Sequence, residues 1–420
     1  MAVETDAMTH RYTEEDYTDW EHTGPGTLGG RYLRRFWQPV YVAKDLKPEW
    51  AAPIKIMSEQ LTLYRGANGT PYLVGFNCAH RGTQLSIGWV EGDCIRCRYH
   101  GWMYDGTGQC VEAPLEEPSF PQKIKIKSYP VHEYLGLIFA YLGEGATPPL
   151  PRHPGLEQEG VIEASSFIRH CNYVQELEND SGHVPFTHPQ NYGGLPPKGS
   201  FCLADVLPQH LISKETKWGL TRSTVTEVHH VTPNTHATGR AYRELKWMVP
   251  IDDESYVSLS TELTPLTEEW DKRREAKAEA EAKGYGRTNY DLIDSVLAGK
   301  VRLEDLDRQA PGYLINIQDG AVQIGQGRIR DKETGHLGRS DVFIVMLRKI
   351  KEREQRALAE GRPLKQWQSS AYPWPASSTW PGIPADPELD DYLHLPRPAK
   401  QPGTSAAKPP SEWQRALSRS

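Results

Sequence analysis

Short runs in which hydrophobic and polar positions alternate dominate the first part of the chain. The alternation has a period of two and is rich in β-branched and aromatic residues, which predicts half-buried strands. The predicted strands are Val40–Val42, Gln60–Tyr64, Tyr72–Val74, Lys123–Lys127 and Tyr134–Tyr141. Turn sequences such as Gly66-Ala67-Asn68-Gly69 separate these runs, so we predict a compact all-β domain over residues 38–147.

Beyond the Pro-rich run Thr147–Pro151, helical and strand patterns are mixed. Apolar spacing predicts a helix from Asn172 to Glu178 and a long amphipathic helix from Ser340 to Glu360, with Gly361 as its stop. Strand-like runs lie between these helices, at Gly219–Val228, Ala241–Met248 and Tyr256–Leu263. We therefore predict a second domain, over residues 148–362.

Further segments complete this division of the chain. Residues 1–37 form a lead segment with a short helix over Leu28–Trp37. Thr264 can cap a helix that continues to Lys283, and because this helix is charged on nearly all faces we interpret it as a solvated surface helix. Another helix is predicted over Tyr290–Leu297. Residues 363–420 are rich in Pro, Ser and Trp and are predicted to be a tail that wraps the surface.

Composition narrows the classes of function. The chain has 420 residues, with 48 Lys and Arg against 55 Asp and Glu and a net charge of −7. Because there is no long basic run, this balance argues against nucleic-acid binding and electrostatic attachment to a membrane. The longest apolar run, Tyr134–Leu142, has about half the length of a membrane span. A polar N-terminus and only six cysteines lead us to expect a soluble cytoplasmic protein.

Candidate chemistry is concentrated between Phe76 and Gly108. The pairs Cys78-Ala79-His80 and Cys97-Arg98-Tyr99-His100 are separated by sixteen residues. Two thiolates with two imidazoles suit a [2Fe–2S] centre. A structural zinc site that uses Cys94 and Cys97 with one or two of the histidines is the alternative. Each pair, however, joins one Cys to one His and is followed by glycine, so that backbone N–H groups can reach cluster sulfurs, which favours iron–sulfur.

A second dense cluster runs from Asp180 to His188 and contains His183. Two histidines and a carboxylate on one face of an iron are typical of non-haem Fe(II) oxygenases. Histidines five residues apart diverge by about 140° on a regular helix, but Pro185 must end or kink the helix here. Asp180 would share a helical face with His183 and could accept its other ring N–H. The plainer interpretation is a polar helix terminus.

The two Cys/His loops, with Tyr99-His100-Gly101-Trp102 and Tyr104-Asp105-Gly106, resemble a Rieske ferredoxin domain. Combined with the Asp180–His188 cluster, they make the chain similar to the Rieske non-haem iron oxygenases, above all to the branch of phthalate dioxygenase and the aromatic O-demethylases. The following segments carry that resemblance: Thr23–Thr27, Arg34–Trp37, Cys171–Gln175, Gln318-Asp319, Gly327–Asp331 and His336–Asp341.

The resemblance implies an α+β protein, in which a Rieske β-sandwich is followed by a catalytic domain whose curved antiparallel sheet grips helices. It assigns Cys78 and Cys97 to one cluster iron and His80 and His100 to the other. It assigns a mononuclear Fe(II) to His183, His188 and a downstream carboxylate, for which we choose Asp319 over Asp331 and Asp341. Asp180 would bridge His183 to His100 of a neighbouring subunit. The segment between Glu178-Asn179 and His183 is about two residues shorter than the family's spacing.

The activity implied is that of an oxygenase component that uses O₂ to hydroxylate or O-demethylate an aromatic, carboxylated compound. Electrons would come from NADH through a separate reductase or ferredoxin, and the chain would form a homotrimer or a dimer of trimers. Arg240 and Arg243 are candidates for binding the substrate carboxylate. The alternatives are ring cis-dihydroxylation of the phthalate type, an electron-transfer protein without catalytic iron, and a zinc-stabilised binding module.

Overall fold

The computed structural model describes residues 12–179, 212–217, 219–223, 228–231, 235–238, 243–264, 266–282, 290–306, 311–331, 335–338 and 341–367. The predicted site residues Asp180, His183, His188 and Arg240 lie outside the described residues, as does the tail from residue 368 onward. Arg243 begins a described strand, but its side chain is outside the description.

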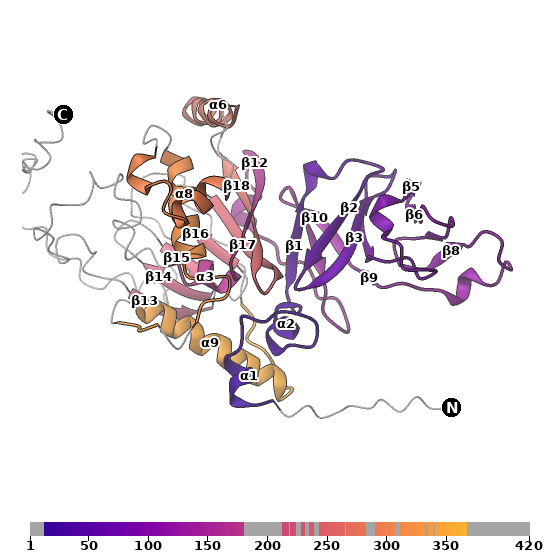
Figure 1. Ribbon diagram of the computed structural model, residues 1–420, viewed down its shortest axis with the longest axis horizontal. Helices are drawn as coiled ribbons and strands as arrows, with labels where there is room; N and C mark the ends of the chain where they lie inside the picture. Colours follow the sequence, from indigo (N-terminus) through magenta and orange to yellow (C-terminus); the bar gives the residue numbers. More distant parts are fainter. Residues whose placement is uncertain are drawn as a thin grey trace, which may run out of the picture.

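The N-terminal body consists of three antiparallel sheets (Figure 1). A three-stranded sheet has the order β1-β11-β10, with β1 at Trp37–Val42, β11 at Leu137–Tyr141 and β10 at Val131–Tyr134. A four-stranded sheet joins β2 (Ala51–Ile56), β3 (Glu59–Arg65), β4 (Pro71–Gly75) and β9 (Ser128–Tyr129). The third joins β5 (Trp89–Glu91), β6 (Cys94–Arg96), β7 (Met103–Tyr104) and β8 (Cys110–Glu112). Short 3₁₀ turns lie at Ala43–Asp45, Leu85–Ile87 and Pro121–Lys123.

Three of the predicted elements in this body differ from the structure. The run Tyr134–Tyr141 is not one strand: Leu135 and Gly136 have φ values of 50° and 76° and turn the chain between β10 and β11, as a two-residue hairpin requires. The strand predicted at Lys123–Lys127 is wrong, because this segment crosses between sheets and makes only an isolated bridge, from Lys125 to Gln109. The predicted helix Leu28–Trp37 is too long, since α2 covers Leu28–Leu33 and β1 begins at Trp37.

The second body is built on a seven-stranded antiparallel sheet with the order β12-β18-β17-β16-β15-β14-β13. Its strands are β12 (Val161–Arg169), β13 (Ile212–Thr216), β14 (Gly219–Ser223), β15 (Val228–Val231), β16 (Thr235–Thr238), β17 (Arg243–Asp252) and β18 (Ser255–Thr264). Helix α3 (Tyr173–Leu177) and helix α8 (Pro311–Ile324) lie beside the sheet on the side away from the first body (Figure 1). The sheet and its helices make the chain an α+β protein, as predicted.

The remaining helices surround this sheet. They are α6 (Glu268–Ala282), α7 (Tyr290–Leu297) and α9 (Val342–Ala359), with 3₁₀ turns at Pro154–Leu156 and Leu303–Asp305. The predicted cap at Thr264 is wrong, because Thr264 is the last residue of β18 and its hydroxyl donates to the Val161 carbonyl at 3.3 Å. Helix α9 matches its prediction to within two residues at each end. No helix within the described ranges is long and apolar enough to cross a membrane.

A turn of the first body docks into the sheet of the second. Met57 and Ser58 join β2 to β3 with φ values of 46° and 62°, and their N–H groups donate to the carbonyls of Pro250 and Ile251 at 2.8 and 2.9 Å. The Met57 side chain is fully buried. Phe139 of β11 meets Trp247 of β17 edge to face, with ring centroids 5.3 Å apart. One hydrophobic core therefore runs through both bodies.

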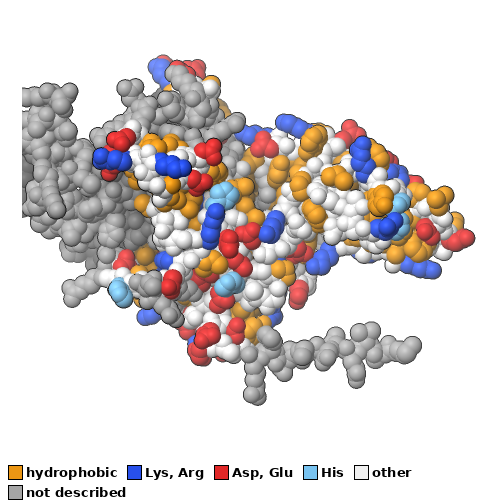
Figure 2. All heavy atoms as spheres, in the orientation of Figure 1, with side chains coloured by type: hydrophobic (Ala, Val, Ile, Leu, Met, Phe, Trp, Pro, Cys, Tyr) orange, Lys and Arg blue, Asp and Glu red, His pale blue; other side chains and the backbone are white. Residues whose placement is uncertain are grey.

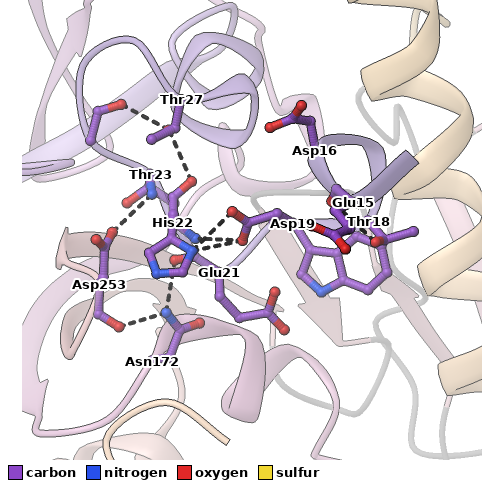
Figure 3. Close-up of polar contacts among 12 residues, drawn as sticks. Glu15, Asp16, Thr18, Asp19, Glu21, His22, Thr23, Thr27, Asn172 and Asp253 are labelled. Atoms are coloured by element: carbon purple, nitrogen blue, oxygen red, sulfur yellow. Dashed lines mark hydrogen bonds and ion pairs between the residues drawn. The ribbon is translucent and has the colours of Figure 1, made fainter. Parts of the chain in front are cut away.

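The lead segment fixes the start of α3 (Figure 3). Helix α1 (Glu14–Thr18) precedes a stretch whose backbone carbonyls accept hydrogen bonds from α3: the Tyr173 hydroxyl donates to Trp20 at 2.9 Å and the Asn172 amide donates to Glu21 at 2.9 Å. The same Asn172 amide donates to the Asp253 carbonyl at 2.6 Å in the β17–β18 turn. Asn172 also caps α3 by accepting from the Val174 N–H at 3.0 Å. The lead segment, α3 and the sheet are thus joined at one point.

Candidate metal centres

The two Cys/His segments form loops of the same backbone design. In the first loop the Cys78 N–H donates to the Thr83 carbonyl at 2.8 Å, and the Gly82 N–H donates back to the Cys78 carbonyl at 2.9 Å. In the second loop Cys97, Gly101 and Trp102 repeat both bonds, at 2.8 and 3.1 Å. Each glycine has a φ of 74° or 78°, a conformation that L residues adopt at a cost. Glycine is therefore needed at this position in both loops.

The four predicted ligands converge between these loops. Cys78 and Cys97 are 3% and 2% exposed, and the Cys97 thiol lies close enough to help raise the pKa of the Cys78 thiol. The imidazole rings of His80 and His100 have centroids 4.5 Å apart. The Nδ1 atom of His80 is buried and has no hydrogen-bond partner among the described residues. A ring nitrogen with a free lone pair and two neighbouring thiols are what an iron–sulfur cluster of this ligand type requires, so the residues fit the group.

Tyr104 places a hydroxyl on this site. Its oxygen lies 3.2 Å from the Cys78 sulfur and accepts the Ala79 N–H at 3.1 Å, so the Tyr104 O–H is free to donate to the sulfur. Burial raises the pKa of the Cys78 thiol, while Tyr104 and the His80 N–H act in the opposite direction by stabilising the thiolate. Hydrogen bonds to a ligand sulfur tune the potential of an iron–sulfur centre.

The two histidines lie in different surroundings. His80 stacks on the buried Trp102 ring, with centroids 4.7 Å apart and an interplanar angle of 10°. His100 is exposed and lies against Tyr99, itself 55% exposed. Partial desolvation, His80 and the Arg81 guanidinium lower the pKa of His100. Of the two rings, His100 is the one that an approaching molecule can reach.

Basic and aromatic side chains surround this exposed edge. The Arg81 guanidinium lies over the Tyr99 ring at 5.5 Å and the Arg98 guanidinium lies over the Trp89 ring at 4.7 Å. Figure 2 shows histidine, basic and hydrophobic atoms together at the tip of the N-terminal body. Exposed aromatic rings and two guanidinium groups therefore lie together at this edge, a combination suited to a protein partner.

Cys94, the thiol of the zinc alternative, is surrounded by different groups. It begins β6 and is half-buried. Burial and the nearby carboxylates Asp105 and Asp93 raise the pKa of its thiol, and Arg96 lowers it. No group of three His, Cys, Asp or Glu side chains in the part of the chain that the structure describes is arranged around a single metal ion.

The structure separates the three carboxylates considered for the second metal. Asp319 is half-buried on α8. Asp341 stands before the first turn of α9, where its carboxylate accepts the Gly338 N–H at 2.6 Å, and Asp331 is exposed. Helix α8 packs against α3, whose chain leads into the segment of His183 and His188. Asp319 is thus the one of the three carboxylates that lies on the helix bonded to α3, through the contacts of Gln323 with Gln175 and Glu176.

Ion pairs that the sequence did not reveal hold the end of α3. The Glu178 carboxylate accepts two bonds from Arg348 of α9, at 2.7 and 2.8 Å, and pairs with Arg330 at 2.6 Å. Its side chain is 3% exposed. Burial alone would raise the pKa of Glu178, but the two guanidinium groups lower it below its ordinary value. In the sequence, these ion pairs are indicated only by the position of Glu178 at the end of a short predicted helix.

The Cys/His loops and helix α8 lie at opposite ends of the part of the chain that the structure describes (Figure 1). The Cys/His loops belong to the tip formed by β5, β6, β7 and β8, whereas Asp319 lies on α8 beyond the seven-stranded sheet. The body of the first domain and the sheet of the second separate them within one chain.

Comparison with known proteins gives the family. The model of the family described as "Rieske [2Fe-2S] domain" matches residues 36–130. The 5,5'-dehydrodivanillate O-demethylase oxygenase subunit of Sphingobium sp. (strain NBRC 103272 / SYK-6) is 30% identical over 366 residues, which cover 81% of this chain and 80% of that protein. The chain belongs to the Rieske non-haem iron oxygenases.

Further relatives place this Rieske oxygenase among oxygenase subunits with diverse substrates. The tert-butanol monooxygenase / tert-amyl alcohol desaturase oxygenase subunit of Aquincola tertiaricarbonis is 29% identical, over 78% of this chain and 74% of that protein. The phthalate 4,5-dioxygenase oxygenase subunit of Pseudomonas putida is 27% identical, over 76% and 81%. A solved structure of the reduced complex between oxygenase and ferredoxin in carbazole 1,9a-dioxygenase has the same fold, with a TM-score of 0.53, 21% identity and coverage of 83% and 95%.

Family membership decides between the classes left open by the sequence. A Rieske oxygenase uses a [2Fe–2S] cluster, a mononuclear non-haem iron and O₂, and it acts as the oxygenase subunit of a multicomponent enzyme. The zinc-stabilised module and the electron-transfer protein without catalytic iron are therefore set aside. The expected enzyme class, fold and cofactors are confirmed.

Proposed function

We propose that this Rieske oxygenase removes the methyl group of a methoxylated aromatic acid. One observation carries this choice: a relative matched over about four fifths of both chains is named as an aromatic O-demethylase subunit. Oxygen insertion at a methoxy carbon gives a hemiacetal, which loses formaldehyde and leaves a phenol. Ring dihydroxylation is the second candidate, favoured by the phthalate relative. The tert-butanol relative makes hydroxylation of an aliphatic C–H bond a third outcome to test.

We propose Cys78, Cys97, His80 and His100 as the cluster ligands. The matching loops, the two buried thiols and the partnerless Nδ1 of His80 support this assignment. When bound, a cluster with two imidazole ligands takes up and releases single electrons at about −150 to +300 mV. In this arrangement Tyr104 holds a proton toward the Cys78 sulfur, and Trp102 covers the buried face of His80.

For the mononuclear iron we propose His183, His188 and Asp319. A set of two histidines and one carboxylate leaves positions on Fe(II) where O₂ and substrate can meet. The half-buried place of Asp319 on α8, against the helix that leads into the histidine segment, supports the choice of carboxylate. Arg240 and Arg243 stay candidates for a substrate carboxylate.

We further propose that electrons cross between subunits. Asp180 would accept one hydrogen bond from His183 and another from His100 of the partner subunit, within a homotrimer or a dimer of trimers. Two observations support this: the Cys/His loops and helix α8 lie at opposite ends of one chain, and His100 with Tyr99 is exposed at the tip.

The electron donor is proposed to be a separate reductase or ferredoxin that draws on NADH. The carbazole 1,9a-dioxygenase oxygenase has been solved in complex with a ferredoxin, and the exposed Arg81 and Arg98 offer two guanidinium groups to carboxylates of a donor. We propose a cytoplasmic location, since the five described cysteines are all free. We propose that the chain divides into a lead segment (residues 1–37), a Rieske domain (38–147), a catalytic domain (148–362) and a C-terminal tail (363–420).

The deciding experiment supplies the oxygenase with a reductase, NADH and O₂, and offers methoxylated benzoates, phthalate and tert-butanol in parallel. We expect formaldehyde and a phenol from a methoxylated acid, with one O₂ consumed for each formaldehyde. A cis-diol from phthalate without formaldehyde from any methoxylated acid would contradict O-demethylation. Metal analysis accompanies the assay: about three irons per chain fit the proposed centres, and two would contradict the second.

A further inference from the structure

Glu176 is a buried carboxylate that joins four elements of the catalytic body. It lies on α3, where one oxygen accepts the Lys246 ammonium of β17 at 2.6 Å. The other oxygen accepts the Gln323 amide of α8 at 2.6 Å and the Tyr256 hydroxyl of β18 at 3.0 Å. Neither of the proposed centres uses Glu176 as a ligand.

A second cation completes this buried network. Arg169, at the end of β12, is 2% exposed and donates to the Gln323 side-chain oxygen at 3.0 Å, while its Nε has no hydrogen-bond partner among the described residues. Burial disfavours the charged guanidinium, but the pKa of Arg169 is raised because Tyr256, Glu176 and Asp319 favour its charged form. Glu176 is thus the carboxylate that contacts Lys246 directly and that, together with Asp319, favours the charged form of Arg169.

The network includes the helix that carries Asp319 and the helix that precedes the histidines in sequence. Gln323 follows Asp319 by four residues, so the two side chains lie one turn apart on the same face of α8. On the other side, α3 ends at Leu177, and residues 178–182 separate it from His183 in the sequence.

Main-chain contacts strengthen the same joint. The Gln175 amide donates to the carbonyls of Gln323 and Gly327, at 2.7 and 3.1 Å, and so ties α3 to the end of α8. The link before His183 is also about two residues shorter than the family's spacing. The contacts of Gln175 and Glu176 with Gln323 thus hold α3, which precedes this link, against the end of α8.

We propose that Glu176 is a positioning residue for the mononuclear iron. It locks α3 to α8 and neutralises Lys246 and Arg169, whose buried positive charge would otherwise oppose a divalent cation beside Asp319. This inference rests on the proposed function, because it takes Asp319, His183 and His188 as the ligands.

The test is the affinity of the full-length protein for Fe(II), measured by anaerobic equilibrium dialysis with metal analysis. Glu176→Gln keeps the shape of the side chain and removes its charge. We expect the Kd for the mononuclear Fe(II) to rise by about 10- to 100-fold, the range found when groups behind metal ligands are changed. Acid-labile sulfide, which reports the [2Fe–2S] cluster, stays at the wild-type level.

Two further variants separate a local effect from general damage. Glu215→Gln is the matched control: Glu215 also pairs with two cations, Arg353 at 2.8 Å and Lys365 at 2.7 Å, but lies on β13 at the opposite edge of the sheet from β12. It is expected to leave the Fe(II) Kd unchanged. The double variant Glu176→Gln/Lys246→Met removes one cation together with the carboxylate, and it is expected to recover most of the lost affinity.

The outcomes distinguish the inference from the proposed function. If the wild type binds no iron beyond the cluster, the mononuclear site itself is wrong. If the wild type binds it and folded Glu176→Gln binds it equally well, only the role of Glu176 is wrong. A double variant no better than Glu176→Gln also overturns the charge argument. Should Glu176→Gln fail to fold, the double variant decides: wild-type affinity supports the inference, and weak binding overturns it.

Discussion

At the scale of single residues, hydrogen bonds from neighbouring donors stabilise the negative charge of buried groups. Tyr104 donates to a ligand sulfur because its oxygen is already occupied by the Ala79 N–H. Glu178 stays ionised in a buried place because Arg348 and Arg330 surround it. In both cases one or two neighbouring donors stabilise the negative charge of a buried group, so single substitutions give measurable effects.

Replacing Tyr104 by Phe removes the donor to Cys78 and leaves the ring in place. The hydrogen bond stabilises the more negative, reduced cluster, and bonds to charged groups contribute about 1.5–3 kcal/mol. Since about 1.4 kcal/mol corresponds to 59 mV for one electron, we expect the potential to fall by about 60–120 mV in a redox titration followed by electron paramagnetic resonance. Tyr64→Phe is the control, because the Tyr64 hydroxyl donates to the Asp93 carbonyl instead. Equal potentials in Tyr104→Phe and the wild type would contradict this role.

Glu178 predicts how stability responds to acid. Its folded-state pKa is lowered, so its contribution is fully present above the unfolded pKa of about 4.3 and is lost as the pH falls toward the folded pKa. Glu178→Gln should therefore lower the urea midpoint at pH 7, with a loss of about 3–5 kcal/mol for a broken buried pair, and flatten its decline below about pH 4. Glu304→Gln changes an exposed pair with Arg302 and should leave the profile intact. An unchanged slope in Glu178→Gln would refute the linkage.

At the scale of elements, several helices and strands end at residues whose φ is positive. Helix α9 stops at Gly361, which has a φ of 66° and open space where a Cβ would stand. The same rule explains the hairpin at Leu135-Gly136 and the docking turn at Met57-Ser58. Helix α9 also carries Arg348, which holds Glu178 at the end of α3, so α9 and the end of α3 belong to one packed unit.

Gly361→Ala isolates this backbone effect, because no neighbouring atom would contact the added methyl group. We expect a loss of about 1–2 kcal/mol in the free energy of unfolding, since an L residue in the left-handed region costs about that much. Gly361→Asn should lose less, because Asn tolerates this conformation better. Urea denaturation measures both. An alanine variant as stable as the wild type would show that the helix end relaxes.

At the scale of the whole molecule, the separation of the two centres makes the oligomer part of the proposed mechanism. The Cys/His loops and helix α8 lie at opposite ends of one chain (Figure 1), and the tip that carries His100 also exposes Trp89 and Tyr99. A head-to-tail ring would bring the tip of one chain to the catalytic body of the next, in keeping with closed symmetry.

Mixing two inactive chains tests this arrangement. Cys97→Ser removes a proposed cluster ligand and Asp319→Ala removes a proposed ligand of the mononuclear iron, so each variant alone should be inactive. Co-expressed, they form mixed oligomers in which an intact loop pair can face an intact iron site, and we expect activity to return. The control pairs Cys97→Ser with the chain that carries both substitutions. Mixed oligomers, verified by sedimentation and mass spectrometry, that stay inactive would contradict transfer between subunits.

The sequence by itself determined what depends on short-range chemistry. Helix α7 and helix α9 follow from periodicity and from the glycine stop, and the paired Cys/His loops from residue types at fixed spacing. The α+β class and the family followed from the same motifs. Where neighbouring residues carry the same polarity, as in Tyr134–Tyr141, the pattern could not separate two strands from one.

Only the tertiary structure decided which distant charges meet. Glu176, Lys246 and Arg169 lie on α3, β17 and β12, and each looks like an isolated charge in an apolar stretch until the fold brings them together. The placement of α8 against α3, and of the Cys/His loops and α8 at opposite ends, likewise depends on how the sheet and helices pack. Pairing across long sequence separations is set by the closure of the whole core around them, which no local pattern encodes.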